Sequence, residues 1–210
     1  MTKSKTIQPK YFKPVFAALL AAVIVLLTFT VGSLRIGPIT ITLNCLPVAL
    51  GAVLLGPVYG AVLGLVFGLT SFFASFTSAS LTTVLLNINP FFTFLMCVVP
   101  RVICGWVPGL IFQHLPKNNE PKRLGSSALS CALVTVLNTI GFLGLMWVFF
   151  ANAFVSEPTV IDKVGRQPAG NIFVFIFALA SINAVFEVIV NLVLGTAICR
   201  ALFAVTKKVL

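Results

Sequence analysis

Apolar runs dominate the chain, and short polar breaks divide them into six segments. The segments extend over about Pro14–Ser33, 43–56, 58–76, Asn89–Phe112, Ser126–Phe154 and Gly170–Phe203. A membrane-spanning helix needs about 20 apolar residues, so the second segment is short, and such a helix is tolerated where it is buried in protein or lines a cavity. The pattern therefore predicts an all-α integral membrane protein with six transmembrane helices, folded as a single domain over residues 1–210.

Three breaks in this pattern predict connections on the outer side of the membrane. The segment RIGPITITL, residues 35–43, alternates Ile and Thr after a Gly37-Pro38 turn and predicts a short extended loop. The Ser/Thr-rich stretch TSASLTTVLL, residues 77–86, predicts a second loop, and SEPTVIDKVGRQP, residues 156–168, predicts a third. The third is neutral overall, which suits an outer loop because cytoplasmic loops carry the excess of Lys and Arg.

Composition and the placement of charge agree with this interpretation. The chain is 59% hydrophobic and 9% charged, with a mean hydropathy of +1.12, whereas soluble domains contain about 25% charged residues. The cations gather in three clusters: Lys3, Lys5, Lys10 and Lys13; Lys117, Lys122 and Arg123; Arg200, Lys207 and Lys208. Such clusters mark the cytoplasmic side near anionic lipid headgroups. We therefore expect both termini in the cytoplasm and no nucleic-acid surface.

The sequence offers little that could support catalysis or cofactor binding. None of the five cysteines forms a C-x-x-C pair or has a His, Asp or Glu at metal-ligand spacing. The chain contains no G-x-x-x-x-G-K-[ST] phosphate loop, no G-x-S-x-G and no H-E-x-x-H motif. We therefore expect neither an enzyme nor an ATPase, and neither a metal nor a cofactor.

Two ionisable residues stand out because they lie deep within apolar segments: Arg101 and Glu187. One such charge in a membrane-spanning helix costs roughly 2.5–3.5 kcal/mol, so both are expected to face protein or water. With a rise of about 1.5 Å per residue, Thr70, Asn138 and Asn183 come to a depth similar to that of Arg101. Four helices are thus expected to contribute polar groups to one layer within the membrane.

This layer has two interpretations, which the sequence leaves open. In the first, Arg101 pairs with Glu187, and the asparagines tie helices together by hydrogen bonds. In the second, the layer is the floor of a pocket open to the outside, where Arg101 binds a carboxylate through its planar guanidinium and Glu187 orients Arg101 or accepts from a hydroxyl. The second interpretation predicts these substrate-binding residues: Arg101, Asn138, Asn183, Glu187, Asn89, Thr70 and Asn44. Asn44 and Asn89 are expected nearer the outer opening of this pocket, where the 35–43 loop is expected to act as a lid.

The first apolar segment carries a different signal. In FAALLAAVIV, Ala17 and Ala21 are four residues apart, as are Ala18 and Ala22. Small residues at this spacing form a flat groove on which another helix packs closely. The groove is expected either to dock a partner protein or to pack against the other helices of the same chain.

Three long stretches together resemble a known family. They are ITITLNCLPVALGAVLLGPVYGAVLGLVFGLTSFF, NINPFFTFLMCVVPRVICGWVPGL and NAVFEVIVNLVLGTAI, at residues 39–73, 87–110 and 183–198. The chain is similar to the substrate-binding S component of energy-coupling factor (ECF) transporters, most of all to the pantothenate-specific type. The resemblance covers nearly the whole chain.

The resemblance implies a six-helix bundle with a small-molecule pocket near the outer leaflet, capped by the loop between the first and second helices and by other outer loops. It also implies partners: a transmembrane coupling protein, which the alanine groove of the first helix would dock, and two cytoplasmic ATPase subunits. Members of the family are thought to topple in the membrane and so carry the closed pocket inward.

The sequence thus predicts a vitamin-uptake subunit of a bacterial plasma membrane, binding pantothenate. Two alternatives stay open: an S component for another water-soluble vitamin, and a self-sufficient permease with Glu187 as proton carrier. A membrane enzyme or assembly factor is disfavoured because no pairing of a nucleophile with a base is apparent.

Overall fold

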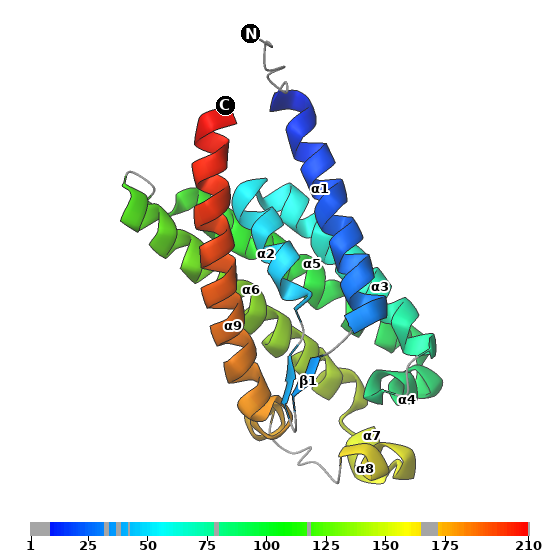
Figure 1. Cartoon of the computed structure of the whole chain (residues 1–210). Coiled ribbons are helices and arrows are strands. Elements are labelled where there is room, and N and C mark those ends of the chain that lie inside the picture. Colours follow the sequence, from blue (N-terminus) through cyan, green and yellow to red (C-terminus); the bar gives the residue numbers. More distant parts are fainter. Residues whose placement is uncertain are drawn as a thin grey trace.

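The protein is a bundle of helices that run along one another, with small elements gathered at one end (Figure 1). The computed structural model describes residues 9–31, 34–36, 39–41, 43–77, 80–116, 119–164 and 172–209. Its elements are α1 (Pro9–Leu26), a π-helical turn η1 (Leu27–Val31), β1 (Leu34–Ile36), β2 (Ile39–Ile41), α2 (Cys45–Leu54), α3 (Pro57–Thr77), α4 (Leu81–Ile88), α5 (Pro90–His114), α6 (Glu120–Phe150), α7 (Ala153–Ser156), α8 (Pro158–Val164) and α9 (Ile172–Val209).

The predicted membrane architecture is confirmed. Within the described ranges, five helices are long and apolar enough to cross a membrane, and the short apolar helix α2 is the sixth. The N-terminal end of α1 and the C-terminal end of α9 lie at the same end of the molecule (Figure 1), as an even number of crossings requires. Large apolar side chains are exposed on the outside of the bundle, among them Val15, Val62, Trp106 and Val148, and they are suited to contact lipid.

The outer connections differ in part from their prediction as loops. Residues 34–36 and 39–41 are extended as predicted, and they pair as an antiparallel hairpin with Arg35 opposite Thr40. The prediction of a loop over 77–86 is wrong from residue 81 onward, where α4 begins. Ser80 and Thr83 form a capping box at the start of α4, which satisfies backbone donors that a helix end leaves free. A short helix, α8, likewise lies within the third predicted loop.

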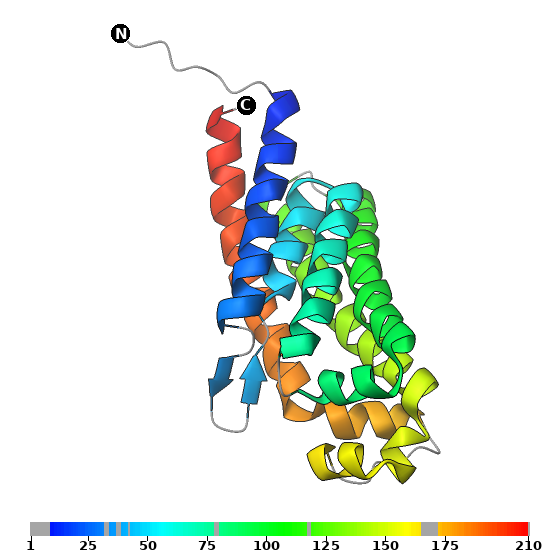
Figure 2. The ribbon, with the colours of Figure 1, turned by 90° about the vertical axis from the view of Figure 1, so that its right-hand side faces the viewer.

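The last helix changes direction along its length. A candidate span, Ala184–Phe203, lies in the part of α9 whose side chains the structure describes, and the residues before it, IFVFIFALASIN, are also apolar. The first part of α9 runs across the end of the bundle before the helix turns to run along it (Figure 2). The span predicted from about Gly170 therefore includes residues that run across the end of the bundle and not along it.

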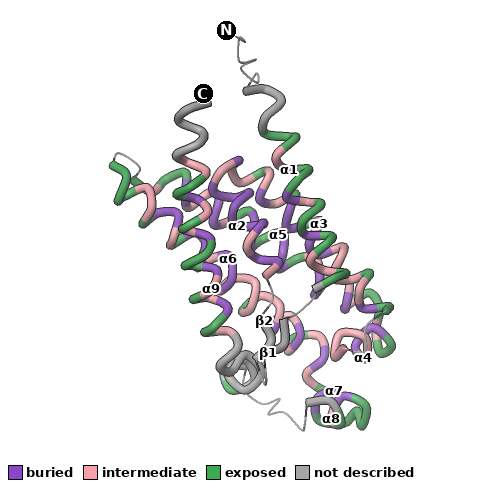
Figure 3. The backbone as a smooth tube through the Cα atoms, in the orientation of Figure 1, coloured by how far each residue is buried: buried purple, intermediate pink, exposed green. Residues whose placement is uncertain are grey.

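Buried apolar residues form two clusters along the bundle. The inner cluster lies toward the end with the termini and includes Ile24, Val48, Leu63, Phe67, Cys104, Cys131, Val134 and Cys199. The outer cluster lies toward α4, α7 and α8 and includes Leu85, Met96, Cys97, Met146, Phe150, Phe154 and Val160. Figure 3 shows buried positions along the helices that face one another. Arg101 lies between the clusters, because its neighbours Phe67 and Cys97 belong to different ones.

Glycines set the close approach of α3 and α5. A Cβ at Gly60 would overlap the carbonyl oxygen of Gly105, and one at Gly64 would overlap the carbonyl oxygen of Arg101. A Cβ at Gly68 would lie 2.8 Å from the Cα of Val98. Only residues without a side chain allow two helix backbones to pack this closely. This contact fixes the position of the helical turn that carries Arg101.

Candidate functional site

Arg101 is buried in the interior of the bundle and does not face lipid. Its side chain is 8% exposed. The guanidinium lies over two aromatic rings, with its central carbon 4.8 Å from the ring centroids of Phe67 and Phe142. Stacking of Arg on aromatic faces is favourable. The flat cation is thus held between α3 and α6 with its orientation fixed.

The hydrogen bonds of Arg101 use only part of its donor set. Nη1 donates to the carbonyl oxygens of Cys97 at 2.7 Å and Met96 at 3.5 Å. Nε is buried and has no hydrogen-bond partner within the described residues. An unpaired donor on a buried cation costs free energy. The side-on edge of the guanidinium is therefore suited to an acceptor that binds there.

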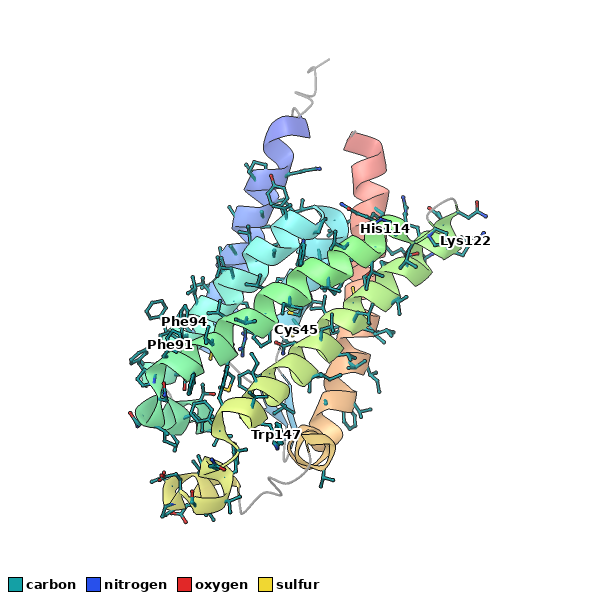
Figure 4. All side chains as sticks on the ribbon, turned by 180° about the vertical axis from the view of Figure 1, so that it is seen from behind. Cys45, Phe91, Phe94, His114, Lys122 and Trp147 are labelled. Carbon is teal, nitrogen blue, oxygen red and sulfur yellow. The ribbon has the colours of Figure 1, made fainter. Side chains whose placement is uncertain are left out.

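Glu187 approaches the same region from α9. Its side chain is 8% exposed and is a hydrogen-bonding neighbour of the Cys45 thiol at the start of α2. Arg101 acts electrostatically on that same thiol. The start of the short helix α2 therefore lies near both buried charges, and Figure 4 shows Cys45 in the middle of the bundle.

Asn44 and Thr70 belong to a hydrogen-bonded group at the outer end of α2. The Nδ2 group of Asn44 donates to Thr28 Oγ1 at 3.1 Å. Thr28 Oγ1 lies 3.4 Å from Thr70 Oγ1, and each threonine hydroxyl also donates to its own helix. The Oδ1 atom of Asn44 is buried and has no hydrogen-bond partner in the part of the chain that the structure describes. These residues join η1, α2 and α3, and they leave one acceptor available.

On α6, the structure brings further unpaired polar atoms into the interior. The Oδ1 atom of Asn138 is buried without a hydrogen-bond partner, as is the hydroxyl of Thr135 one turn away and that of Ser130. On α9, neither Oδ1 nor Nδ2 of Asn191 has a partner, although the residue is fully buried. All these atoms lack partners within the described part of the chain. Each unsatisfied buried group costs about 1–3 kcal/mol, so the gathering of several unpaired polar atoms on α6 and α9 calls for an explanation.

Thr135, Ser130 and Asn191 are not among the substrate-binding residues predicted from the sequence. A signal for Asn191 was present, since it is four residues after Glu187 and so lies on the same helix face. No comparable signal marked Thr135, because only the register of α6 against α9 brings a threonine to an asparagine.

Two candidates occupy different surroundings. Asn89 begins α5, where its Oδ1 accepts hydrogen bonds from the backbone N–H groups of Phe91 at 3.1 Å and Phe92 at 3.2 Å. This is the geometry of a helix N-cap, and Figure 4 places the neighbouring Phe91 at the far end of the bundle from His114. The side chain of Asn183 lies outside the described residues, so its predicted role stays a prediction.

The alanines of α1 divide between two faces. Ala17 is buried and Ala21 is half-buried, whereas Ala18 and Ala22 are exposed. Ala17 belongs to the inner cluster together with Leu20 and Ile24. Ala17 and Ala21 therefore pack within the chain, whereas Ala18 and Ala22 face outward.

The described residues hold no group of three or more His, Cys, Asp or Glu side chains able to bind a metal ion. What they do hold is a buried Arg, a buried Glu and several unpaired amide and hydroxyl groups in the middle of a membrane-spanning bundle. Buried ionisable groups in membrane helices mark substrate pathways. The arrangement defines a multi-pass transport protein with a polar site inside the membrane.

The chain belongs to the family described as "ECF transporter, substrate-specific component", whose family model matches residues 13–199. The predicted family and the predicted bundle are thereby confirmed, and the protein is a multi-pass protein of the bacterial plasma membrane. A relative named pantothenate transporter PanT, from Leuconostoc mesenteroides subsp. mesenteroides, is 25% identical over 163 residues, which are 77% of this chain and 74% of the relative.

Proposed function

We propose that this chain is the pantothenate-binding subunit of an ECF transporter, with Arg101 as the residue that holds the substrate carboxylate. The observation that carries the proposal is the buried guanidinium between Phe67 and Phe142, whose Nε has no hydrogen-bond partner within the described residues. A carboxylate accepts from a guanidinium in a planar, bidentate geometry. The name of the relative from Leuconostoc supports the choice of pantothenate.

Groups around Arg101 suit the remainder of pantothenate, which carries an amide and two hydroxyls. The Oδ1 atoms of Asn138 and Asn44 are buried acceptors without partners in the described chain. Glu187 lies near the same point from α9 and is proposed to orient Arg101 or to accept from a substrate hydroxyl. Thr70 takes part indirectly, through its contact with Thr28, the partner of Asn44. The hairpin of β1 and β2 is proposed as the lid over this site.

Energy for uptake is proposed to come from partner proteins. Ala18 and Ala22 form an exposed pair on α1, and small residues at this spacing let another helix approach closely. A transmembrane coupling protein is proposed to pack on this pair, with two cytoplasmic ATPase subunits bound to it. Toppling of the closed subunit would then carry pantothenate to the cytoplasmic side.

Titration of the purified protein with pantothenate tests the proposal. The Arg101→Ala variant is expected to lose at least about 30-fold in affinity, because truncating one partner of a buried, hydrogen-bonded charge pair costs about 2–5 kcal/mol. Arg123→Ala is the matched control. Arg123 also lies over a ring, 4.3 Å from the centroid of Phe203, but it belongs to the first turn of α6, far along the helix from Phe142. Unchanged affinity in Arg101→Ala would reject the assigned role.

A second measurement separates this function from that of a self-sufficient permease. The proposed subunit co-purifies with ATPase subunits and takes up pantothenate only when ATP is supplied. Uptake in vesicles that contain a proton gradient and no ATP, abolished by Glu187→Gln, would instead assign Glu187 to proton transfer.

A further inference from the structure

The facing sides of α6 and α9 hold the largest group of unpaired buried polar atoms. Thr135 on α6 and Asn191 on α9 are both fully buried. The hydroxyl of Thr135 and both polar atoms of the Asn191 amide lack hydrogen-bond partners in the described part of the chain. A buried amide that is bonded neither to its own helix nor to a neighbouring helix stabilises the fold less than an apolar residue of the same shape would.

The register of the two helices places Thr135 opposite Asn191. A Cβ at Gly195 would lie 2.7 Å from the Sγ of Cys131, and the thiols of Cys131 and Cys199 are hydrogen-bonding neighbours. The helices are antiparallel, so one turn outward from this contact leads to Thr135 on α6 and to Asn191 on α9. A further turn outward leads to Asn138 and Glu187.

The rise of an α-helix gives the separation between Thr135 and the ring over which Arg101 lies. The guanidinium lies over the ring of Phe142 on α6, seven residues from Thr135. At about 1.5 Å per residue, this separation along α6 is roughly 10 Å. That length is comparable to the extended length of a small acid whose carboxylate lies at one end and whose hydroxyls lie at the other.

We propose that Thr135 and Asn191 form an inner subsite that hydrogen-bonds the hydroxyl- and amide-bearing end of the substrate, while Arg101 holds its carboxylate. The inference rests on the proposed function for the identity of the substrate. It adds two specificity-determining residues, and it orients the substrate along α6 with its uncharged end toward the cytoplasmic side. The amide of Asn191 offers both a donor and an acceptor, which suits hydroxyl groups.

Two substitutions of similar shape test the subsite: Asn191→Leu and Thr135→Val. Affinity is measured for pantothenate and for pantothenol, the alcohol that lacks the carboxylate. Each variant is expected to lose about 10-fold or more for both compounds, as expected when a buried hydrogen bond is lost. Arg101→Ala is expected to weaken pantothenate only, so that the preference for pantothenate over pantothenol disappears.

Unfolding of the substrate-free variants distinguishes a binding role from a structural one. The unfolding temperatures of Asn191→Leu and Thr135→Val are expected to stay unchanged or rise, because the substitutions remove unpaired polar groups. Thr93→Val is the matched control: Thr93 is equally buried, but its hydroxyl donates to the carbonyl oxygen of Asn89 at 2.9 Å. This control is expected to unfold at a lower temperature and to keep its affinity.

The outcomes separate the two proposals. Unchanged affinity for both compounds in Asn191→Leu and Thr135→Val would overturn the inner subsite and leave pantothenate binding intact. If the wild-type protein binds neither compound, pantothenate is the wrong substrate. Mass spectrometry of the small molecules retained on purification then tests whether the inner subsite binds the actual substrate. A molecule retained by the wild type and lost from Asn191→Leu supports it, and equal retention overturns it.

Discussion

The α3–α5 pair and the α6–α9 pair are both helix contacts within one bundle, yet they are built in opposite ways. Along α3–α5, glycines bring one backbone directly against the other, and a Cβ at Gly60 or Gly64 would overlap a carbonyl oxygen of α5. Along α6–α9, a Cβ at Gly195 would instead meet a side chain, that of Cys131. One turn outward, this second contact holds the polar groups of Thr135 and Asn191 without partners in the described chain.

The two contacts are expected to differ in how they affect stability. Close packing of the α3 and α5 backbones gains dispersion contacts along both helices. It also fixes the turn of α5 that carries Arg101. Unpaired amide and hydroxyl groups weaken the other contact in the absence of substrate. In the proposed inner subsite, these groups are satisfied only while the substrate is bound.

The largest expected effect comes from breaking the α3–α5 contact. In Gly64→Ala the new methyl group would overlap the backbone of Arg101, which cannot move aside as a side chain can. Overpacking costs about 1–3 kcal/mol and occasionally more, and here we expect about 3 kcal/mol or more, measured as loss of folded protein in detergent and a lower unfolding temperature. In Gly144→Ala the methyl group has no atom within 4 Å, so this control is expected to stay folded. Equal behaviour of the two variants would contradict backbone-limited packing.

A smaller loss of stability is expected at the α6–α9 contact, and a second substitution should restore much of it. Gly195→Ala places a methyl group 2.7 Å from the Sγ of Cys131 and is expected to cost about 1–3 kcal/mol in unfolding free energy. Adding Cys131→Ala removes that sulfur and is expected to restore much of the loss, so the two substitutions should be non-additive by about 1 kcal/mol. Strictly additive effects in the double-mutant cycle would show that the helices do not meet at this point.

The smallest effect concerns the start of α5. Asn89→Ala removes the side-chain acceptor for Phe91 and Phe92 and is expected to lower the unfolding free energy by about 0.5–2 kcal/mol, with pantothenate affinity unchanged. Asn89→Asp keeps the acceptor and is expected to retain stability. If Asn89→Ala instead lowers affinity without destabilising the protein, Asn89 belongs to the site as the sequence analysis proposed.

Much of the fold could be predicted because the membrane restricts the choices. A lipid-exposed backbone must satisfy its own hydrogen bonds, so apolar runs of sufficient length predict helices, and even the short helix at Cys45–Leu54 was found from its length and the following Pro57. Helix α4 was missed because Ser and Thr favour caps as well as loops. Composition likewise does not reveal that the first part of α9 runs across the end of the bundle.

The candidate site was predicted less completely, and the reason lies in helix rotation and register. Arg101 and Glu187 could be singled out because a charge among apolar residues is conspicuous in any sequence. Phe67 and Phe142, which hold the guanidinium, look like ordinary apolar residues until two helices are placed on either side of it. Asn89 looked like a site residue, although its acceptor is bonded to the backbone of α5.

The sequence by itself determined that this chain crosses the membrane several times, on which side its termini lie, which two charges are buried and to which family it belongs. The crossings, the side of the termini and the buried charges follow from local composition, because transfer into lipid depends on the kind of residue and the length of the run. The family follows from the resemblance of long stretches of the sequence, which the family model over residues 13–199 confirms. Only the tertiary structure decided which polar atoms have partners. Hydrogen bonds between helices depend on how each helix is rotated and shifted against its neighbours, and packing across the whole bundle sets both.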